Sequence, residues 1–182
     1  MVYILLGTGF EETEAIAPCD LLRRAGVETC FVGIGAQTVT GSHGIAVKAD
    51  VTLDEIDFDA MQMVVLPGGL RGVQSISQSR QALELVRRAY DDGKYVAAIC
   101  AAPTILAALG ITDGKCATCY PGMEDRMGTA QMTDAPAVTD GTVITGRAAG
   151  SAMAFGLALV AALRGKQAAD AVADAVVCPH LG

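Results

Sequence analysis

The sequence predicts an α/β fold, a three-layer sandwich in which helices cover both faces of a mostly parallel sheet. Short apolar runs alternate with helical patterns along the chain, which is typical of this architecture. Two of the runs, residues 2–6 and 95–99, hold only apolar or aromatic residues, as expected for central strands buried on both faces. At 182 residues the chain can bury a full core, so we expect residues 1–182 to form a single domain.

The first half of the chain begins with a βαβ unit, whose handedness is almost always right-handed. Its helix is expected to end at Gly26, in the position that follows a helix C-cap. The expected elements of this half are a strand at 2–6, a helix at 11–25, a strand at 29–34, a small hairpin at 38–48, a strand at 61–66 and an amphipathic helix at 79–92.

The second half continues the alternation. The segment 151–163 is almost free of charge and therefore predicts a buried helix. The expected elements are a strand at 95–99, a helix from about residue 102, a short strand at 116–120, a strand or hairpin at 138–145 around Asp140-Gly141, the helix at 151–163 and a weaker last helix at 167–177.

The charge and cysteine content exclude several classes of partner. The net charge of −7 argues against binding to nucleic acid or to an anionic membrane surface. The apolar segment 155–163 has only about half the length that a bilayer-spanning helix needs. Six cysteines are too sparse for a small disulfide framework, and no basic region precedes the first apolar run. We therefore expect a reducing, cytoplasmic setting.

Cys100 stands at the corner between the strand at 95–99 and the following helix. Pro103 suits the first turn of that helix, where an N–H group is not needed. The chain must reverse within one or two residues, which thrusts the side chain out at the carboxyl edge of the sheet, as in a nucleophile elbow. Free N–H groups at the helix start would lower the thiol pKa. A buried structural cysteine is the alternative, but the strand–turn–helix context favours a reactive thiol.

Two glycine-containing turns lie at the same edge of the predicted sheet. Gly68-Gly69 follows the strand at 61–66, and its N–H groups could stabilise an oxyanion, although turn chemistry alone would explain the pair. The segment GTGFEE at 7–12 resembles a dinucleotide fingerprint, but Glu12 replaces its third glycine and no acid closes the second strand. We therefore expect no nucleotide cofactor.

Three glutamates crowd the first turn of the helix at 11–25. Glu11 and Glu12 are expected to be solvated acids that complement the helix dipole. Glu14 precedes the apolar face of the helix, and its side chain could reach over the sheet edge toward neighbouring loops. The residues alone do not decide whether Glu14 is a solvated acid at the helix start or a functional residue at the sheet edge.

No metal site is expected. His43 lies in the predicted hairpin loop without an evident ligand partner, so we expect a polar loop residue. Cys116 and Cys119 form a CxxC, but residues three apart in a strand face opposite ways and no second pair lies at zinc-finger spacing. Both cysteines are expected to be structural.

Taken together, several segments give the chain a resemblance to a known family. They are GFEETEA at 9–15, DLLRRAG at 20–26, VVLPGG at 64–69, AAICAAP at 97–103 and TGRAAGSAMAFGLALV at 145–160. In these the chain resembles the ThiJ/PfpI superfamily, in the branch of the human parkinsonism-associated protein deglycase and the bacterial YajL-like proteins. The resemblance implies a flavodoxin-like fold, a homodimer, a reactive Cys100, a partner carboxylic acid at Glu14, and an anion pocket lined by the N–H groups near Gly69 and Ala101.

The chain departs from the family pattern at one position. The human protein places a histidine where this sequence has Tyr120, so no Cys–His pair can form there; YajL-like proteins also lack it. The departure argues against efficient general-base catalysis at this position. The protease branch carries a histidine directly after the cysteine, whereas Ala101 follows here. Glutaminase triads need a late His-x-Glu, whereas the late histidine here is His180 in CPHLG, which argues against amide hydrolysis.

The leading hypothesis is a cofactor-independent cysteine enzyme of the glyoxalase III or protein deglycase type. It would convert methylglyoxal or glyoxal to the hydroxy acid, or reverse their early adducts on amines and thiols. Cys100 would attack the aldehyde, the amides near Gly69 and Ala101 would stabilise the oxyanion, and Glu14 would move protons. The rival is a non-enzymatic redox sensor or holdase chaperone for oxidative stress, whose signal is oxidation of Cys100.

Overall fold

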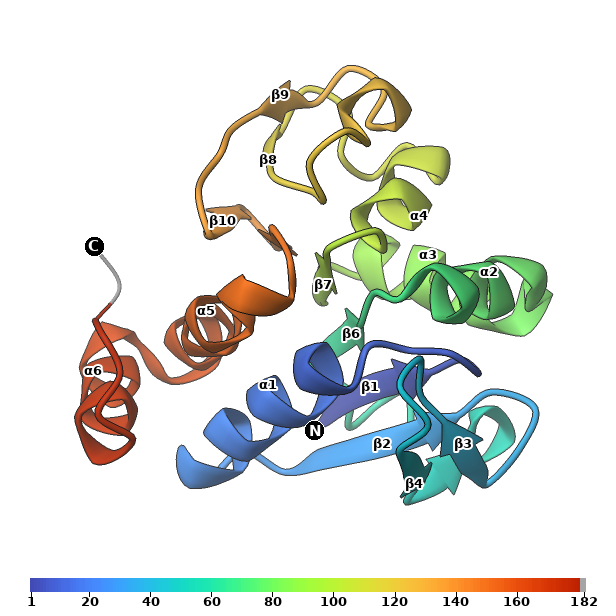
Figure 1. Cartoon of the computed structure of the whole chain (residues 1–182), viewed down its shortest axis with the longest axis horizontal. Helices are drawn as coiled ribbons and strands as arrows, with labels where there is room; N and C mark the ends of the chain where they lie inside the picture. Colours follow the sequence, from blue (N-terminus) through green and yellow to red (C-terminus); the bar gives the residue numbers. More distant parts are fainter. Residues whose placement is uncertain (181–182) are drawn as a thin grey trace.

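The computed structural model describes residues 1–180 and has the expected layered α/β architecture (Figure 1). Its central sheet has seven strands in the order β10-β11-β7-β6-β1-β2-β5. Every neighbouring pair is parallel except β10 with β11. The strands are β1 (Val2–Leu6), β2 (Thr29–Gly33), β5 (Val51–Thr52), β6 (Met63–Leu66), β7 (Tyr95–Ile99), β10 (Ala137–Asp140) and β11 (Val143–Gly146).

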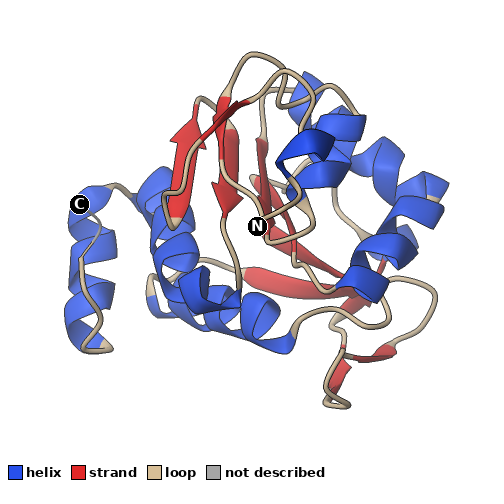
Figure 2. Cartoon of the chain, turned by 45° about the horizontal axis from the view of Figure 1, so that its top comes forward, coloured by secondary structure: helices blue, strands red, loops and turns tan. Residues whose placement is uncertain are grey.

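Helices cover both faces of the sheet, as Figure 2 shows. The α-helices are α1 (Glu12–Arg24), α2 (Leu70–Gln78), α3 (Arg80–Asp91), α4 (Pro103–Ala108), α5 (Ala152–Arg164) and α6 (Lys166–Ala175). Alternate side chains of β1 enter two separate cores. Ile4 and Leu6 pack with α1, α5 and α6, whereas Tyr3 and Leu5 pack with α2, α3 and α4. The three-layer sandwich predicted from the sequence is therefore confirmed.

Helix α5 packs closely on α1 because Gly156 has no side chain. A Cβ atom placed there would lie 2.7 Å from Leu21 Cδ1 and 3.0 Å from Pro18 Cα. The weakly charged sequence of α5 is explained by its contacts with the sheet, α1 and α6, with Phe155 fully buried. This contact fixes α1, which carries Glu14.

Most predicted elements are present with small changes at their ends. The hairpin forms from β3 (Thr38–Thr40) and β4 (Ala46–Lys48), and β10 and β11 form the second expected hairpin. Gly26 follows the C-cap of α1 with a φ of 68°. No helix among residues 1–180 is long and apolar enough to cross a bilayer.

Two predictions about local structure need correction. The strand expected at 116–120 ends at Ala117 as β8 (Cys116–Ala117), which pairs in parallel with β9 (Gln131–Met132). It ends there because the Thr118 N–H donates to Thr145 Oγ1 at 2.9 Å and leaves the ladder. Helix α2 was not expected; Ser79 separates it from α3, whose Ala82 N–H donates to Ser79 Oγ at 3.2 Å.

Candidate active site

Cys100 occupies a sharp corner between β7 and the turn that leads to α4. Its φ is 66°, a left-handed conformation that only Cys100 and Val177 adopt among the non-glycine residues 1–180. Such a conformation typically costs about 1–3 kcal/mol and persists only where the surroundings enforce it. Here the Cys100 N–H donates to the Gly146 carbonyl at 2.9 Å, and the Cys100 carbonyl accepts the Tyr120 N–H at 2.7 Å. The elbow expected from the sequence is therefore present, and Pro103 is the first residue of α4.

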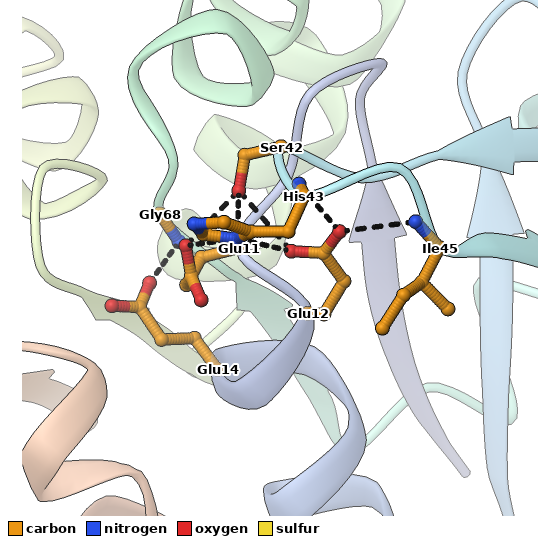
Figure 3. Close-up of polar contacts among 7 residues, drawn as sticks. All are labelled: Glu11, Glu12, Glu14, Ser42, His43, Ile45 and Gly68. Carbon is orange, nitrogen blue, oxygen red and sulfur yellow. Dashed lines mark hydrogen bonds and ion pairs between the residues drawn. The ribbon is translucent and has the colours of Figure 1, made fainter.

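Glu14 projects from the first turn of α1 into the same sheet edge and is fully buried. Its Oε2 accepts the Gly68 N–H at 2.8 Å, as Figure 3 shows. Its Oε1 is buried without a hydrogen-bond partner of good geometry, and the neighbouring polar group is the Cys100 thiol. A Cβ atom on Gly68 would lie 2.5 Å from Glu14 Oε2 and 2.7 Å from Cys100 Cβ. Glycine at this position therefore lets the carboxyl group and the thiol lie together.

Burial dominates the ionisation of this pair. It raises the pKa of Glu14 to about 7, against the lowering effect of hydrogen bonds from Cys100 and the Gly68 N–H. Burial, followed by the charge of Glu14, raises the pKa of Cys100 to about 12. The sequence predicted the opposite direction for the thiol, because the helix start was considered without the adjacent carboxylate. Two buried anions at this range are costly, so the pair keeps at least one proton near neutral pH.

The N–H groups of Gly69 and Ala101 oppose that shift. Both interact with the Cys100 sulfur and lower its pKa. Gly69 is the N-cap of α2 with a φ of 84°, and a Cβ atom there would lie 2.7 Å from the Glu11 nitrogen. Only glycine fits this conformation and this close approach. The structure thus brings together the four residues singled out in the sequence: Glu14, Gly69, Cys100 and Ala101.

A cavity of about 360 Å³ opens onto the thiol. It is mostly apolar and has room for a small organic molecule. Its lining residues are Glu11, Glu14, Gly69, Leu70, Cys100, Ala101, Tyr120, Met123, Ala148, Ala149 and Gly150. Tyr120 does not lie in a strand as expected but in the turn after β8, with 46% of its surface exposed. Its backbone supports the elbow, and its side chain lines the cavity mouth.

Glu11, Glu12, Ser42 and His43 form a polar cluster beside the cavity that the sequence did not predict. Glu12, expected to be solvated, is 5% exposed, and its Oε1 accepts the His43 N–H at 2.7 Å. Its Oε2 lies 3.0 Å from His43 Nδ1, and Ser42 Oγ lies 3.0 Å from Glu11 Oε2 (Figure 3). His43 therefore has two carboxylate neighbours where none was expected. These contacts join residues about thirty positions apart, and no local pattern encodes them.

The two cysteines of the CxxC segment differ in their burial. Cys116 is exposed and Cys119 is buried, and each is a free thiol. Cys116 is the first residue of β8, whereas Cys119 follows the end of that strand. Structural roles for both cysteines stay a prediction.

The fold and the corner cysteine define an α/β protein with a thiol at a nucleophile elbow, and comparison with known proteins identifies the family. The model of the DJ-1/PfpI family matches residues 1–162. Protein dj-1beta of Drosophila melanogaster is 36% identical over 180 residues, which cover 97% of this chain and 96% of that protein. Deglycase PH1704 of Pyrococcus horikoshii is 35% identical over 148 residues, covering 80% and 89%.

Solved structures agree with this assignment. The crystal structure of Drosophila melanogaster DJ-1beta has a TM-score of 0.92 at 34% identity, with 98% of each chain covered. Oxidized DJ-1 of Toxoplasma gondii has a TM-score of 0.94 at 27% identity, again with 98% of each chain covered. The chain belongs to the DJ-1/PfpI family. The resemblance to the ThiJ/PfpI superfamily stated from its motifs is confirmed.

Proposed function

We propose that this protein is a cofactor-independent cysteine enzyme that acts on small α-oxoaldehydes or on their early adducts with amines and thiols. The observation that carries the proposal is the buried Glu14 carboxyl group beside Cys100 at the base of an apolar cavity. Relatives named as deglycases, from three Pyrococcus species, support a reaction of this class.

The first step is addition of the thiol to the aldehyde. The Cys100 sulfur attacks the aldehyde carbon of methylglyoxal, and the carbonyl oxygen becomes the hydroxyl of a hemithioacetal. The N–H groups of Gly69 and Ala101, which already interact with the sulfur, would stabilise the oxyanion as it forms. The proton held by the Glu14–Cys100 pair neutralises that oxygen, which leaves Glu14 as a carboxylate.

The next steps need a base that can return its proton. The Glu14 carboxylate removes the proton from the carbon that bears sulfur, giving an enediolate, and delivers it to the adjacent carbon, while the hydroxyl proton of the hemithioacetal passes to the oxygen of that adjacent carbon. The product is a thioester of lactic acid, and water hydrolyses it to lactate and the free thiol. A carboxyl group whose pKa is about 7 is suited to this exchange, because it can both hold and release a proton at neutral pH. No metal or cofactor takes part in this scheme.

A redox role is the second candidate, and the exposure of Cys100 to the cavity favours it. Oxidation of the thiol to a sulfinic acid would place oxygens next to the Gly69 and Ala101 N–H groups, while protonated Glu14 would donate a hydrogen bond. The related Toxoplasma gondii structure is of an oxidized protein. In this role the protein would sense oxidants or act as a holdase chaperone without turnover.

Steady-state lactate formation from methylglyoxal separates the two roles. An enzyme forms many lactate molecules per chain, and Cys100→Ala abolishes this, whereas Cys30→Ala, at another partly exposed thiol, leaves it intact. A single equivalent of bound aldehyde per chain, with no lactate, would support the redox role instead.

We further propose a homodimer and a reducing, cytoplasmic setting. Ile16 on α1 and Ile45 in the hairpin loop are 42% and 54% exposed, and these two side chains would form the contact with a second copy. All six cysteines are free thiols, which fits a reducing compartment.

A further inference from the structure

The charges around the Cys100 cavity have a single sign. Among the residues that line it, Glu11 and Glu14 are the charged ones, and none is Lys, Arg or His. Arg71 and Arg147 each lie next to a lining residue in the chain but do not line the cavity. Arg147 instead forms an ion pair with Asp134.

Glu11 is placed to act on charges at the cavity mouth. Its side chain is 18% exposed, and its Oε2 is 3.0 Å from Ser42 Oγ and 3.5 Å from His43 Nδ1. His43 lies closer to Glu12, at 3.0 Å, so it balances at most one of these two carboxylates. The negative charge of Glu11 is also felt at the base of the cavity, where it raises the pKa of Glu14.

From this lining we propose that the site selects uncharged carbonyl compounds and rejects anionic ones, and that Glu11 is the residue that determines this specificity. The inference rests on the proposed function for its substrate class. A carboxylate or phosphate on the substrate would be desolvated beside Glu11 without a cationic partner. Neutral methylglyoxal or a neutral adduct enters freely, whereas glyoxylate or a phosphorylated aldehyde is disfavoured by about tenfold or more.

A pair of alkylating agents tests the charge selection without any need for turnover. Iodoacetamide and iodoacetate have nearly the same shape and differ by one negative charge. The rate constants for alkylation of Cys100, each divided by that for 2-mercaptoethanol, should favour iodoacetamide by about tenfold. Glu11→Gln should reduce this preference at least threefold, and Glu11→Asp, which retains the charge, should largely keep it.

The matched control removes one charge from the far end of the same helix. Asp20 is exposed and pairs with Arg24, so Asp20→Asn should leave the preference unchanged. Equal effects of Glu11→Gln and Asp20→Asn, or a parent preference no greater than that of 2-mercaptoethanol, would overturn the inference.

Inhibition of lactate formation by glyoxylate links the result to substrate choice. We expect weak inhibition in the parent protein and inhibition at least threefold stronger in Glu11→Gln, relative to turnover of methylglyoxal by the same variant. If alkylation is charge-selective but no lactate forms, the proposed enzymatic function is refuted and the proposed charge selection by the cavity stands. If lactate forms but iodoacetamide and iodoacetate show no difference in relative rate, the proposed enzymatic function stands and the proposed role of Glu11 is refuted.

Discussion

Glu14 and Cys100 interact as one titrating unit, because the charge of Glu14 raises the pKa of Cys100, whereas the hydrogen bond from Cys100 lowers the pKa of Glu14. The sequence identified the cysteine through its corner but left Glu14 undecided. The role of Glu14 depends on its hydrogen bond from the Gly68 N–H, 54 positions away, and on the packing of α1, which buries its side chain. Family resemblance supplied this pairing where local patterns could not.

Thiol labelling tests whether Glu14 activates the Cys100 thiol. We expect alkylation near neutral pH to favour Cys100 over the other five cysteines, because the Glu14 carboxylate can accept the thiol proton as the sulfur attacks, while the N–H groups of Gly69 and Ala101 stabilise the thiolate that forms. Peptide mapping after one equivalent of iodoacetamide provides the measurement. Preferential labelling of the exposed Cys116 would show that Glu14 does not activate the Cys100 thiol.

The pH dependence of stability should differ in sign between two glutamates of the same helical turn. The folded pKa of Glu14 is raised from 4.5 to about 7, so the folded state binds more protons and loses stability as pH rises from about 4.5 to 7. Glu14→Gln should remove this loss, on the order of 3 kcal/mol for a shift of this size. The pKa of Glu12 is lowered to about 2, so its contribution is present above 4.5 and is lost as pH falls toward 2.

Urea unfolding at pH 3, 5 and 8 measures both effects. Glu14→Gln should stabilise the protein relative to the parent at pH 8 but not at pH 5. Glu12→Gln should destabilise it at pH 5 and 8, by about 1–3 kcal/mol for a buried charge-assisted hydrogen bond, and less at pH 3. Identical pH slopes for the parent and Glu14→Gln would contradict a raised pKa at Glu14.

At the scale of elements, the packing of α5 on α1 fixes the position of the helix that carries Glu14. Gly156→Ala should lower stability by about 1–3 kcal/mol, because the overpacking of Leu21 and Pro18 outweighs the helix propensity gained from alanine. Thermal unfolding followed by circular dichroism measures this change. A higher Tm would show that the two helices separate without cost.

Element prediction was accurate where hydrophobic periodicity is strong and failed where tertiary contacts set the boundary. The strands β1 and β7 and the helices α1 and α5 follow from their apolar patterns. Helix α2 was missed because its nine residues include a glycine and two serines; its Val73 and Ile76 pack in the core that contains Tyr3 and Leu5. Strand β8 was overextended because its end depends on a side-chain contact with Thr145.

For the whole molecule, the proposed dimer has a direct mass test. Light scattering at micromolar concentration should give twice the 18.6 kDa mass of the chain. Ile16→Glu combined with Ile45→Glu should shift the protein toward the monomer, since both side chains lose their apolar contact. A parent mass of 18.6 kDa would refute the dimer.

The central claim, that Cys100 and Glu14 form one catalytic unit, is tested most directly by lactate turnover in Glu14→Gln. Glutamine keeps the shape and can still accept the Gly68 N–H, but it cannot take up a proton and return it. We expect turnover to fall by about 10² or more, the usual scale for a lost general base, while Cys100 still reacts stoichiometrically with iodoacetamide. Normal turnover in Glu14→Gln would contradict the account, because the carboxyl group would then take no part in proton transfer.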